Sequence, residues 1–270
     1  MSNAGRIPIY NDVVDAAQRI VGYAVPTPLI ESPEINQRVG GRVLVKAEVL
    51  QRTGAFKFRG AWNRISQLTN QERRAGVVTF SSGNHGQAVA AAARLSKIAA
   101  TVVMPQTAPN IKLENTRRHG AKIVLYDPLT ESREIIAGDI ASRTGAVLVP
   151  PYDDPRIISG QGTVGLEIAD QADELGLQID VVLVPCSGGG LVAGCAIALK
   201  ERFPNAEIHA VEPEGFDDTA RSLVSGLRET NDVGAVTFCD ALCVPTPGEI
   251  TFAINHYQYV FNIKLLTFCF

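Results

Sequence analysis

Short apolar runs rich in β-branched residues recur along the chain and alternate with segments of helical periodicity. The strand-like runs lie at 43–45, 77–80, 101–104, 122–126, 147–149, 181–184 and 208–211. The helical patterns lie at 86–97, 111–119, 131–143, 162–175 and 191–202. Alternation of strands and helices is typical of parallel sheets with helices on both faces. The pattern therefore predicts an α/β fold.

The chain is expected to form two lobes. Its 270 residues approach the size at which a single hydrophobic core divides. No internal repeat or low-complexity linker separates two halves, which indicates that the lobes are interleaved. We predict a small lobe at 69–153 inserted into a larger lobe made of 1–68 and 154–270.

Composition and charge narrow the class of partner. The chain is 46% hydrophobic and 20% charged, with a formal net charge of −3, as expected of a globular protein. This charge argues against a large nucleic-acid surface and favours small polar substrates. No uninterrupted apolar stretch is long enough to span a bilayer, and the N-terminus lacks the layout of a signal peptide. The sequence therefore predicts a cytoplasmic protein with no membrane contact.

The cysteines indicate a reducing compartment. They are Cys186, Cys195, Cys239, Cys243 and Cys269. An odd number without a paired Cys-x-x-Cys framework favours reduced thiols over disulfides. Cys239 and Cys243 alone make a weak metal candidate.

Lys57 is a candidate reactive amine. It lies between Phe56 and Phe58, just after a strand-like run, and desolvation by aromatic neighbours lowers the pKa of a lysine. The charge of Arg59 is expected to lower the pKa of Lys57 as well. The alternative is a surface lysine at a helix start, with its stem on a phenylalanine and its charge in water.

A polar cluster, Ser81-Ser82-Gly83-Asn84-His85-Gly86-Gln87, follows the strand at 77–80 and opens the helix at 86–97. Backbone N–H groups at a helix start favour an anion, and a substrate carboxylate fits there. The alternative is a capped helix in which Ser or Asn satisfies those N–H groups. One cap residue would be enough for that, whereas four polar side chains lie here around two glycines.

A second helix start carries Ser187-Gly188-Gly189-Gly190-Leu191 after the strand at 181–184. Three successive glycines let the backbone wrap closely around a phosphate at the positive end of a helix. The segment lacks the Lys-Ser/Thr of a P-loop and the spacing of a dinucleotide fingerprint. Tight packing of a strand-to-helix turn is the alternative.

An acidic segment, Glu212-Pro213-Glu214-Gly215-Phe216-Asp217-Asp218, ends the strand at 208–211. Hard oxygen ligands so close together suit Mg²⁺, Ca²⁺ or Mn²⁺. The alternative is a solvated acidic turn.

Composition changes abruptly over 256–270, where five aromatic residues and one lysine occur without any acid. This change suggests an altered reading frame or a shortened C-terminus. The alternative is a buried terminal strand.

Together these segments resemble the pyridoxal-phosphate-dependent serine/threonine dehydratase and serine racemase family, which is built like the β-subunit of tryptophan synthase. The resemblance extends from about Asp12 to Asn255. It includes Thr27-Pro28-Leu29, Gly54 to Ala61, Ser81 to Gln87, Pro151-Tyr152-Asp153-Asp154, Gly160-Gln161-Gly162-Thr163 and Ser187 to Leu191. It implies a two-lobed type II pyridoxal-phosphate fold and a homodimer.

The resemblance also implies how pyridoxal phosphate would be held. Lys57 would bind the cofactor covalently and act as the base at Cα, with Phe56 against the cofactor ring and Asn84 on its 3′-oxygen. The backbone amides that would bind the phosphate belong to Ser187, Gly188, Gly189, Gly190 and Leu191.

Substrate and metal ligands follow from the same resemblance. The residues that would hold the substrate carboxylate are Ser81, Ser82, Asn84 and His85. The serine matching Ser82 is the second base of serine racemases. A divalent cation would be held by Glu212, the carbonyl of Phe216 and Asp218.

The implied reaction is elimination of water from a β-hydroxy amino acid followed by release of ammonia. L-Threonine or L-serine is the expected substrate, giving 2-oxobutanoate or pyruvate. Serine racemisation and elimination from 3-hydroxyaspartate are close alternatives. An alternative of another class is a shortened, non-catalytic remnant.

The chain departs from the family pattern at three places. Ser187 replaces a common glycine, and Cys239-Asp240-Ala241 stands where Ala-Asp-Gly is common. Family members also continue for several tens of residues beyond the match to Asn255, through a segment that places Ser, Thr or Cys beside the pyridine nitrogen. The sequence has no counterpart of that partner, so weaker cofactor retention is expected.

Overall fold

The computed structural model describes residues 6–232 and 234–256. Its strands are β1 (Leu29–Glu31), β2 (Leu44–Lys46), β3 (Val77–Phe80), β4 (Ala100–Pro105), β5 (Lys122–Tyr126), β6 (Val147–Leu148), β7 (Val181–Pro185) and β8 (Glu207–Val211). Its α-helices are α1 (Tyr10–Ile20), α2 (Pro33–Val39), α3 (Lys57–Ser66), α4 (Asn70–Ala75), α5 (Asn84–Leu95), α6 (Asn110–Arg118), α7 (Arg133–Thr144), α8 (Pro155–Glu174), α9 (Gly190–Arg202), α10 (Asp218–Ser225) and α11 (Glu249–Ile254). Two 3₁₀ turns, η1 (Glu48–Leu50) and η2 (Arg52–Gly54), precede α3.

Four parallel strands form one sheet in the order β5-β4-β3-β6. Successive side chains of a strand point to opposite faces, so Val77 packs with the alanines of α5 whereas Val78 and Phe80 pack with Ala137 of α7. The expected parallel sheet with helices on both faces is confirmed. This sheet lies inside the range 69–153, for which the exact lobe boundaries stay a prediction.

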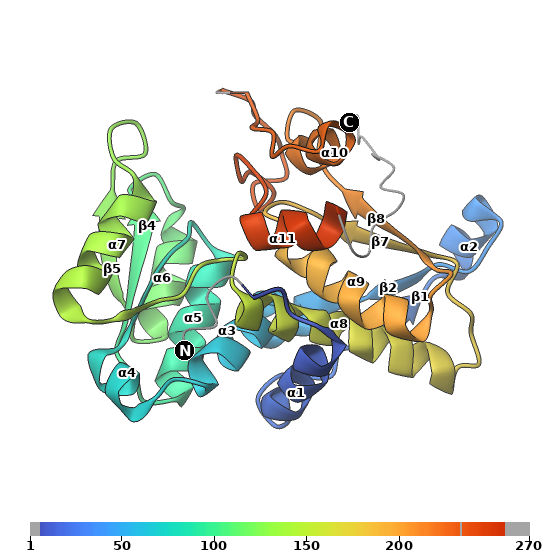
Figure 1. Cartoon of the computed structure of the whole chain (residues 1–270), viewed down its shortest axis with the longest axis horizontal. Coiled ribbons are helices and arrows are strands. Elements are labelled where there is room, and N and C mark those ends of the chain that lie inside the picture. The colour runs from blue at the N-terminus through green and yellow to red at the C-terminus, as the bar shows by residue number, and fades with distance from the viewer. Residues whose placement is uncertain (1–5, 233, 257–270) are drawn as a thin grey trace.

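The other half of the molecule contains the parallel pair β7–β8 and the antiparallel pair β1–β2. Figure 1 shows these strands with α8, α9 and α10 at one end of the molecule, and β4, β5, α4 and α7 at the other. Helix α3 lies directly on α8, because a Cβ on Gly160 would come within 2.5 Å of the Cα of Gly60. This close contact fixes the start of α3, where Lys57 lies.

The helix predicted at 162–175 begins earlier than expected, at Pro155. Asp154 caps it by accepting hydrogen bonds from the N–H groups of Arg156 and Ile157, and proline is favoured at the first helical position. Glycines in the first half of this helix made it hard to predict from the sequence. They lie where another helix packs closely, since a Cβ on Gly162 would lie 2.7 Å from the carbonyl oxygen of Gly194 in α9.

Within the described ranges, no helix combines the length and the apolar character needed to cross a membrane. The segment 256–270, whose composition suggests an altered reading frame or a shortened C-terminus, lies outside the described residues except for His256.

Candidate active site

The ends of β3 and β7 open into one cavity of about 400 Å³. Ligand sites of α/β proteins commonly lie outside the carboxyl ends of parallel strands. The predicted cofactor and substrate residues that line it are Phe56, Lys57, Ser81, Ser82, Asn84, His85, Ser187, Gly188, Gly189, Gly190 and Leu191. The structure therefore brings together three segments that are far apart in the sequence.

Lys57 is half-buried at the start of α3. Its Nζ donates a hydrogen bond to the carbonyl oxygen of Pro151 at 2.7 Å and lies 5.3 Å from the ring centroid of Phe56. Burial lowers the pKa of Lys57 from 10.5 to about 8. The amine thus lies in the cavity with a lowered proton affinity, and the alternative of a solvated surface lysine is wrong.

Arg59 does not lower the pKa of Lys57, contrary to the sequence-based expectation, since burial accounts for that shift. Its buried guanidinium instead donates to both carboxylate oxygens of Glu48 and of Glu167. In an α-helix, residues two positions apart point to nearly opposite sides. Arg59 therefore faces the core behind the helix while Lys57 faces the cavity.

The polar cluster after β3 presents free backbone donors. Gly83 stands at the N-cap of α5 without a side-chain cap, and the first bond of the helix runs from the N–H of Gln87 to the carbonyl of Gly83. The preceding N–H groups of Asn84, His85 and Gly86 therefore have no partner within the helix. The capped-helix alternative is wrong, because no side chain caps α5.

His85 can contribute its backbone N–H more readily than its ring. Its Nε2 lies 3.1 Å from the carbonyl oxygen of Val149, and because a carbonyl only accepts, Nε2 must be the donor. Burial and the charge of Lys57 lower the pKa of His85 to about 3. The ring is neutral, so Nδ1, which lacks a partner among the described residues, is an acceptor and does not suit a carboxylate.

The glycine turn after β7 forms the other wall of the cavity. Gly189 has a φ of +87°, a left-handed conformation that favours glycine. A Cβ on Gly188 would lie 2.5 Å from the ring of Tyr152, and one on Gly190 would lie 3.0 Å from the Cβ of that tyrosine. Side chains are thus excluded from the turn, and no side chain caps α9, which leaves its first N–H groups facing the cavity.

Sequence analysis missed the role of several cavity residues. Arg133, at the start of α7, lines the cavity with its guanidinium 5.4 Å from the ring centroid of Phe80. Lys112 of α6 also lines it and pairs with Asp240 at 2.6 Å. Tyr152 was noted only within a motif. No local signal marks these positions, since each depends on contacts between distant parts of the chain.

The predicted metal ligands lie outside this cavity, after β8 and at the start of α10. Glu212 is fully buried and accepts from the N–H groups of Thr219 and Ala220, while buried Asp218 accepts from Asn231. Burial raises the pKa of Glu212 to about 7 and that of Asp218 to about 6. The solvated-turn alternative does not hold for these two carboxylates.

A metal at this place has limited support. Asp218 Oδ2 is buried and has no hydrogen-bond partner among the described residues, which suits a cation ligand. However, no group of three or more His, Cys, Asp or Glu side chains in 6–232 and 234–256 could hold a metal ion. The weak candidate Cys239–Cys243 likewise belongs to no such group.

The cavity fits pyridoxal phosphate in its chemistry. It contains a primary amine that has no counterion in residues 6–232 and 234–256, and a glycine turn in which there is no room for a Cβ. Its volume of about 400 Å³ lies in the range of cofactor and ligand pockets. The uncapped starts of α5 and α9 offer separate places for a carboxylate and a phosphate.

Comparison with known proteins agrees with this chemistry. Residues 20–260 match the family described as "Pyridoxal-phosphate dependent enzyme". The chain is 43% identical to an L-threo-3-hydroxyaspartate ammonia-lyase of Saccharomyces cerevisiae, covering 92% of this chain and 74% of that protein. It is 38% identical to the catabolic L-threonine dehydratase of Escherichia coli, covering 90% and 73%.

The solved structure of maize serine racemase superposes with a TM-score of 0.91 at 38% identity, covering 97% of this chain and 78% of that one. The expected type II pyridoxal-phosphate fold is thereby confirmed. Relatives with three different activity names lie at similar identity, so the family is defined more sharply than the substrate. The chain belongs to the pyridoxal-phosphate dependent enzymes, within the group that contains the serine/threonine dehydratases and serine racemases.

Proposed function

We propose that the protein is an ammonia-lyase that eliminates water from a β-hydroxy amino acid, L-threonine or L-serine first, and releases ammonia and a 2-oxo acid. One observation carries this proposal. A lysine amine with a lowered pKa shares a single cavity with two uncapped helix starts, one rich in polar side chains and one made of glycine. These are the parts needed to hold an amino acid and a phosphate together.

The cofactor would be held by Lys57, by the ring of Phe56, by Asn84 and by the backbone amides from Ser187 to Leu191. When bound, pyridoxal phosphate supplies the conjugated electron sink that makes the Cα–H bond of an amino acid acidic. The N–H groups at the start of α5 would fix the substrate carboxylate, with Ser81 and Ser82 beside them. Fixing that group orients the Cα–H bond and lowers the entropic part of the barrier.

Lys57 would act as the general base at Cα. An amine with a pKa of about 8 is deprotonated in about a tenth of the molecules at pH 7, and the deprotonated amine can accept the Cα proton at Nζ. The β-hydroxyl would leave as water by taking up the proton that Nζ of Lys57 has accepted from Cα. The unsaturated amine that is released hydrolyses to the 2-oxo acid and ammonia.

The proposal is tested by incubating the purified protein with pyridoxal phosphate and, separately, L-threonine, L-serine and L-threo-3-hydroxyaspartate. Formation of 2-oxo acid and ammonia, lost in Lys57→Ala, is the expected result. Visible absorbance of the lysine-bound cofactor without turnover of any substrate would favour the non-catalytic remnant. Absence of both would reject the assignment.

A second candidate substrate, 3-hydroxyaspartate, is favoured by Arg133. This guanidinium lies at the cavity wall and its ion-pair partner is the adjacent Glu134, at 2.7 Å. A planar guanidinium binds carboxylates in a bidentate manner. The side-chain carboxylate of hydroxyaspartate could therefore be bound there, whereas threonine and serine have no second carboxylate.

Arg133→Gln separates these substrates. If Arg133 binds the second carboxylate, kcat/KM for hydroxyaspartate falls about tenfold to a hundredfold while that for threonine changes little. Arg143→Gln, an exposed arginine on the same helix, is the matched control. An equal loss for both substrates would reject this role of Arg133 and leave the lyase proposal standing.

Racemisation is the remaining alternative, because Ser82 lines the cavity and is exposed. If Ser82 acts as the second base, Ser82→Ala abolishes formation of D-serine from L-serine while elimination continues. Equal loss of both reactions would instead indicate that Ser82 binds the substrate.

We further propose a divalent cation at Glu212 and Asp218, a cytoplasmic location and a homodimer. Support for the cation comes from two buried carboxylates whose pKa values burial raises.

Support for self-association comes from exposed apolar side chains near β2, where Val49 is 76% and Leu50 is 57% exposed. Light scattering tests the homodimer.

A further inference from the structure

The linker between β6 and α8 contacts different parts of the molecule with four successive residues. The carbonyl of Pro151 accepts the hydrogen bond of Lys57, and the ring of Tyr152 lies against the glycine turn. Asp154 caps α8. Asp153, between them, binds the start of α11.

The carboxylate of Asp153 caps α11 from outside the helix. Its Oδ2 accepts from the N–H of Glu249 at 2.9 Å. Its Oδ1 accepts from the N–H of Ile250 at 2.9 Å and from that of Thr251 at 3.3 Å. These are the first three N–H groups of the helix, and the N-cap position is Gly248, which has no side chain to bind them. A helix of six residues has little stability alone, so the position of α11 depends on this cap and on packing.

Helix α11 in turn contacts the glycine turn. The hydroxyl of the fully buried Thr251 donates to the carbonyl of Gly188 at 2.7 Å. The peptide between Gly188 and Gly189 is planar and trans, so its N–H points away from its carbonyl. The N–H of Gly189 is therefore directed away from α11, to the side on which Cys186 lines the cavity.

We propose that Asp153 is a positioning residue for the cofactor phosphate. By capping α11 it holds Thr251 on the carbonyl of Gly188, and so keeps the N–H of Gly189 directed towards the cavity. A turn that receives an anion through its backbone N–H groups needs those groups in fixed directions before the anion binds. This role rests on the proposed function, which puts the phosphate at the glycine turn.

The cap acts more directly on the phosphate end of the site than on the amine end. A Cβ on Gly188 would lie 2.5 Å from the ring of Tyr152, so the linker and the glycine turn are in close contact. The hydrogen bond from Lys57 to Pro151, in contrast, joins the linker to α3 without α11. Loss of the Asp153 carboxylate should therefore weaken binding of a phosphate-bearing aldehyde more than binding of the same aldehyde without phosphate.

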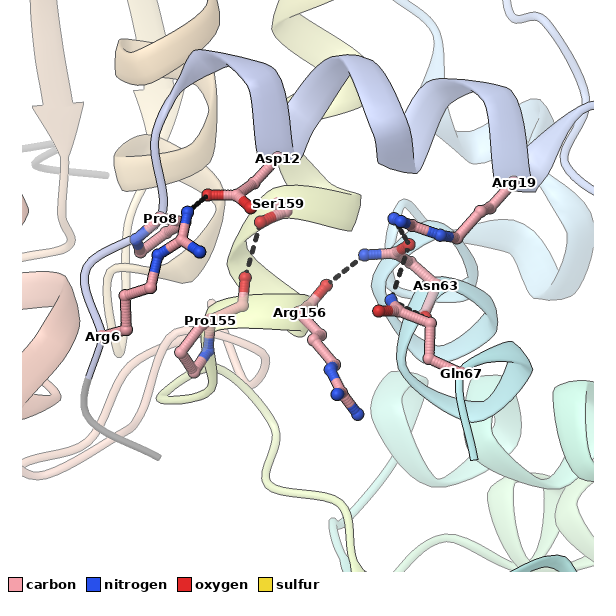
Figure 2. A pocket seen from close by; sticks show the side chains of 9 residues that line it. All are labelled: Arg6, Pro8, Asp12, Arg19, Asn63, Gln67, Pro155, Arg156 and Ser159. Atoms are coloured by element: carbon pink, nitrogen blue, oxygen red, sulfur yellow. Dashed lines mark hydrogen bonds and ion pairs between the residues drawn. The ribbon is translucent and has the colours of Figure 1, made fainter. Parts of the chain in front are cut away.

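Asp154 caps another helix and is the matched control. Its Oδ1 accepts from the first N–H groups of α8, and its Oδ2 accepts from Arg64 of α3 at 3.0 Å. Figure 2 shows a second link between these helices, in which the amide of Asn63 donates to the carbonyl of Arg156 at 2.7 Å. These contacts join α8 to α3 rather than to the glycine turn.

The test compares pyridoxal phosphate with pyridoxal, which lacks the phosphate. Each is titrated into the wild type, Asp153→Ala and Asp154→Ala, and the visible absorbance of the lysine-bound compound gives Kd. In Asp153→Ala the Kd for pyridoxal phosphate should rise about tenfold, whereas that for pyridoxal should change little. Asp154→Ala should change both Kd values by the same factor. Asp153→Asn keeps one acceptor oxygen and should restore part of the affinity for pyridoxal phosphate.

A second variant acts at the other end of the same chain of contacts. Thr251→Val replaces the hydroxyl that binds Gly188 with a methyl group of similar size, and the same selective loss is expected. It keeps the test available should Asp153→Ala fail to fold, as judged by circular dichroism.

The proposal is overturned if the folded variants bind pyridoxal phosphate as tightly as the wild type, or if they lose pyridoxal phosphate and pyridoxal to the same extent. The second result would mean that Asp153 supports the fold in general. A wild type that binds neither compound, or both equally, would reject the proposed cofactor site, and this role of Asp153 with it. None of these outcomes depends on turnover.

Discussion

Lys57 and Arg59 stand two residues apart at the start of α3, and both are cations withdrawn from water, yet their surroundings are opposite. Arg59 is fully buried, with Glu48 and Glu167 each binding its guanidinium through two oxygens. Among the described residues, Lys57 has no counterion, and its amine donates one hydrogen bond, to the carbonyl of Pro151. Burial lowers the pKa of Lys57 to about 8. Burial also acts to lower the pKa of Arg59, but the hydrogen bonds that Arg59 donates to the two carboxylates outweigh it and raise that pKa.

The difference lies in charge balance. Lys46 joins the same network, because its Nζ donates to Glu167, to Gln171 and to the carbonyl of Thr27. Two cations and two carboxylates thus compensate each other behind α3. In front of the helix the amine of Lys57 is left uncompensated, and an uncompensated buried amine is a reactive one. The paired arginine holds the helix, and the unpaired lysine faces the cavity.

The largest effect expected from this contrast is loss of activity on replacing Lys57. The lyase proposal predicts that Lys57→Ala lowers kcat at least about a thousandfold, because the substitution would remove both the attachment point and the general base. Release of 2-oxo acid measures this loss. Lys122→Ala, an exposed lysine on β5, should retain full activity.

Replacing Lys57 should not lower stability, although it should lower activity, and Lys57→Met tests this. The folded pKa of about 8 lies below the usual value of 10.5, so between these values the unfolded chain binds more protons and stability rises with pH. At pH 7 the charged amine destabilises the fold, and the methionine variant should unfold at an equal or higher urea concentration. A clearly lower midpoint would show that Lys57 supports the fold after all.

The second largest effect is expected at Arg59. Arg59→Gln leaves Glu48 and Glu167 without their main partner, and breaking such a buried pair should lower the free energy of unfolding by about 3–5 kcal/mol. Urea titration measures this loss. Arg38→Gln, which breaks an exposed pair with Glu34, should leave the midpoint nearly unchanged. Equal midpoints for both variants would remove the distinction between the two faces of α3.

The sequence predicted the parts that depend on neighbouring residues. Strand-helix alternation predicted the parallel sheet, and the two turns after β3 and β7 were recognised because glycine and small polar residues directly before a helix have a local physical meaning. Their meeting in one cavity follows from the parallel strand arrangement. Local sequence patterns were therefore enough to predict the two turns that form opposite walls of the cavity.

Contacts between distant residues could not be predicted in the same way. The Lys57–Pro151 hydrogen bond and the Lys112–Asp240 ion pair join residues about a hundred positions apart. Arg59 was placed on the wrong side of α3, because neighbours in sequence were treated as neighbours in space. The sequence also left the start of α8 hidden, since Gly160 and Gly162 look unfavourable for a helix until α3 and α9 pack against them.

The smallest effect is expected at a third buried group, Glu212, which resembles Lys57 in having no ion-pair partner among the residues that the structure describes. Burial raises its pKa from 4.5 to about 7. Between these values the folded protein binds more protons than the unfolded chain, so this group makes stability fall as pH rises. In Glu212→Gln, that part of the pH dependence should be absent when the free energy of unfolding is measured at pH 5 and pH 8 with a chelator present.

The slope is more informative than the absolute stability. Both oxygens of Glu212 accept backbone N–H groups, so a glutamine turns its amide nitrogen towards a donor and destabilises the protein at every pH. Glu174→Gln, on the exposed end of α8, should follow the wild-type curve. Added Mg²⁺ should stabilise the wild type at pH 8, where the carboxylate is ionised, and have little effect on Glu212→Gln. If the free energy of unfolding of the wild type and of Glu212→Gln depends on pH in the same way, Glu212 is ionised in the folded protein without a cation, as Glu167 is beside Arg59.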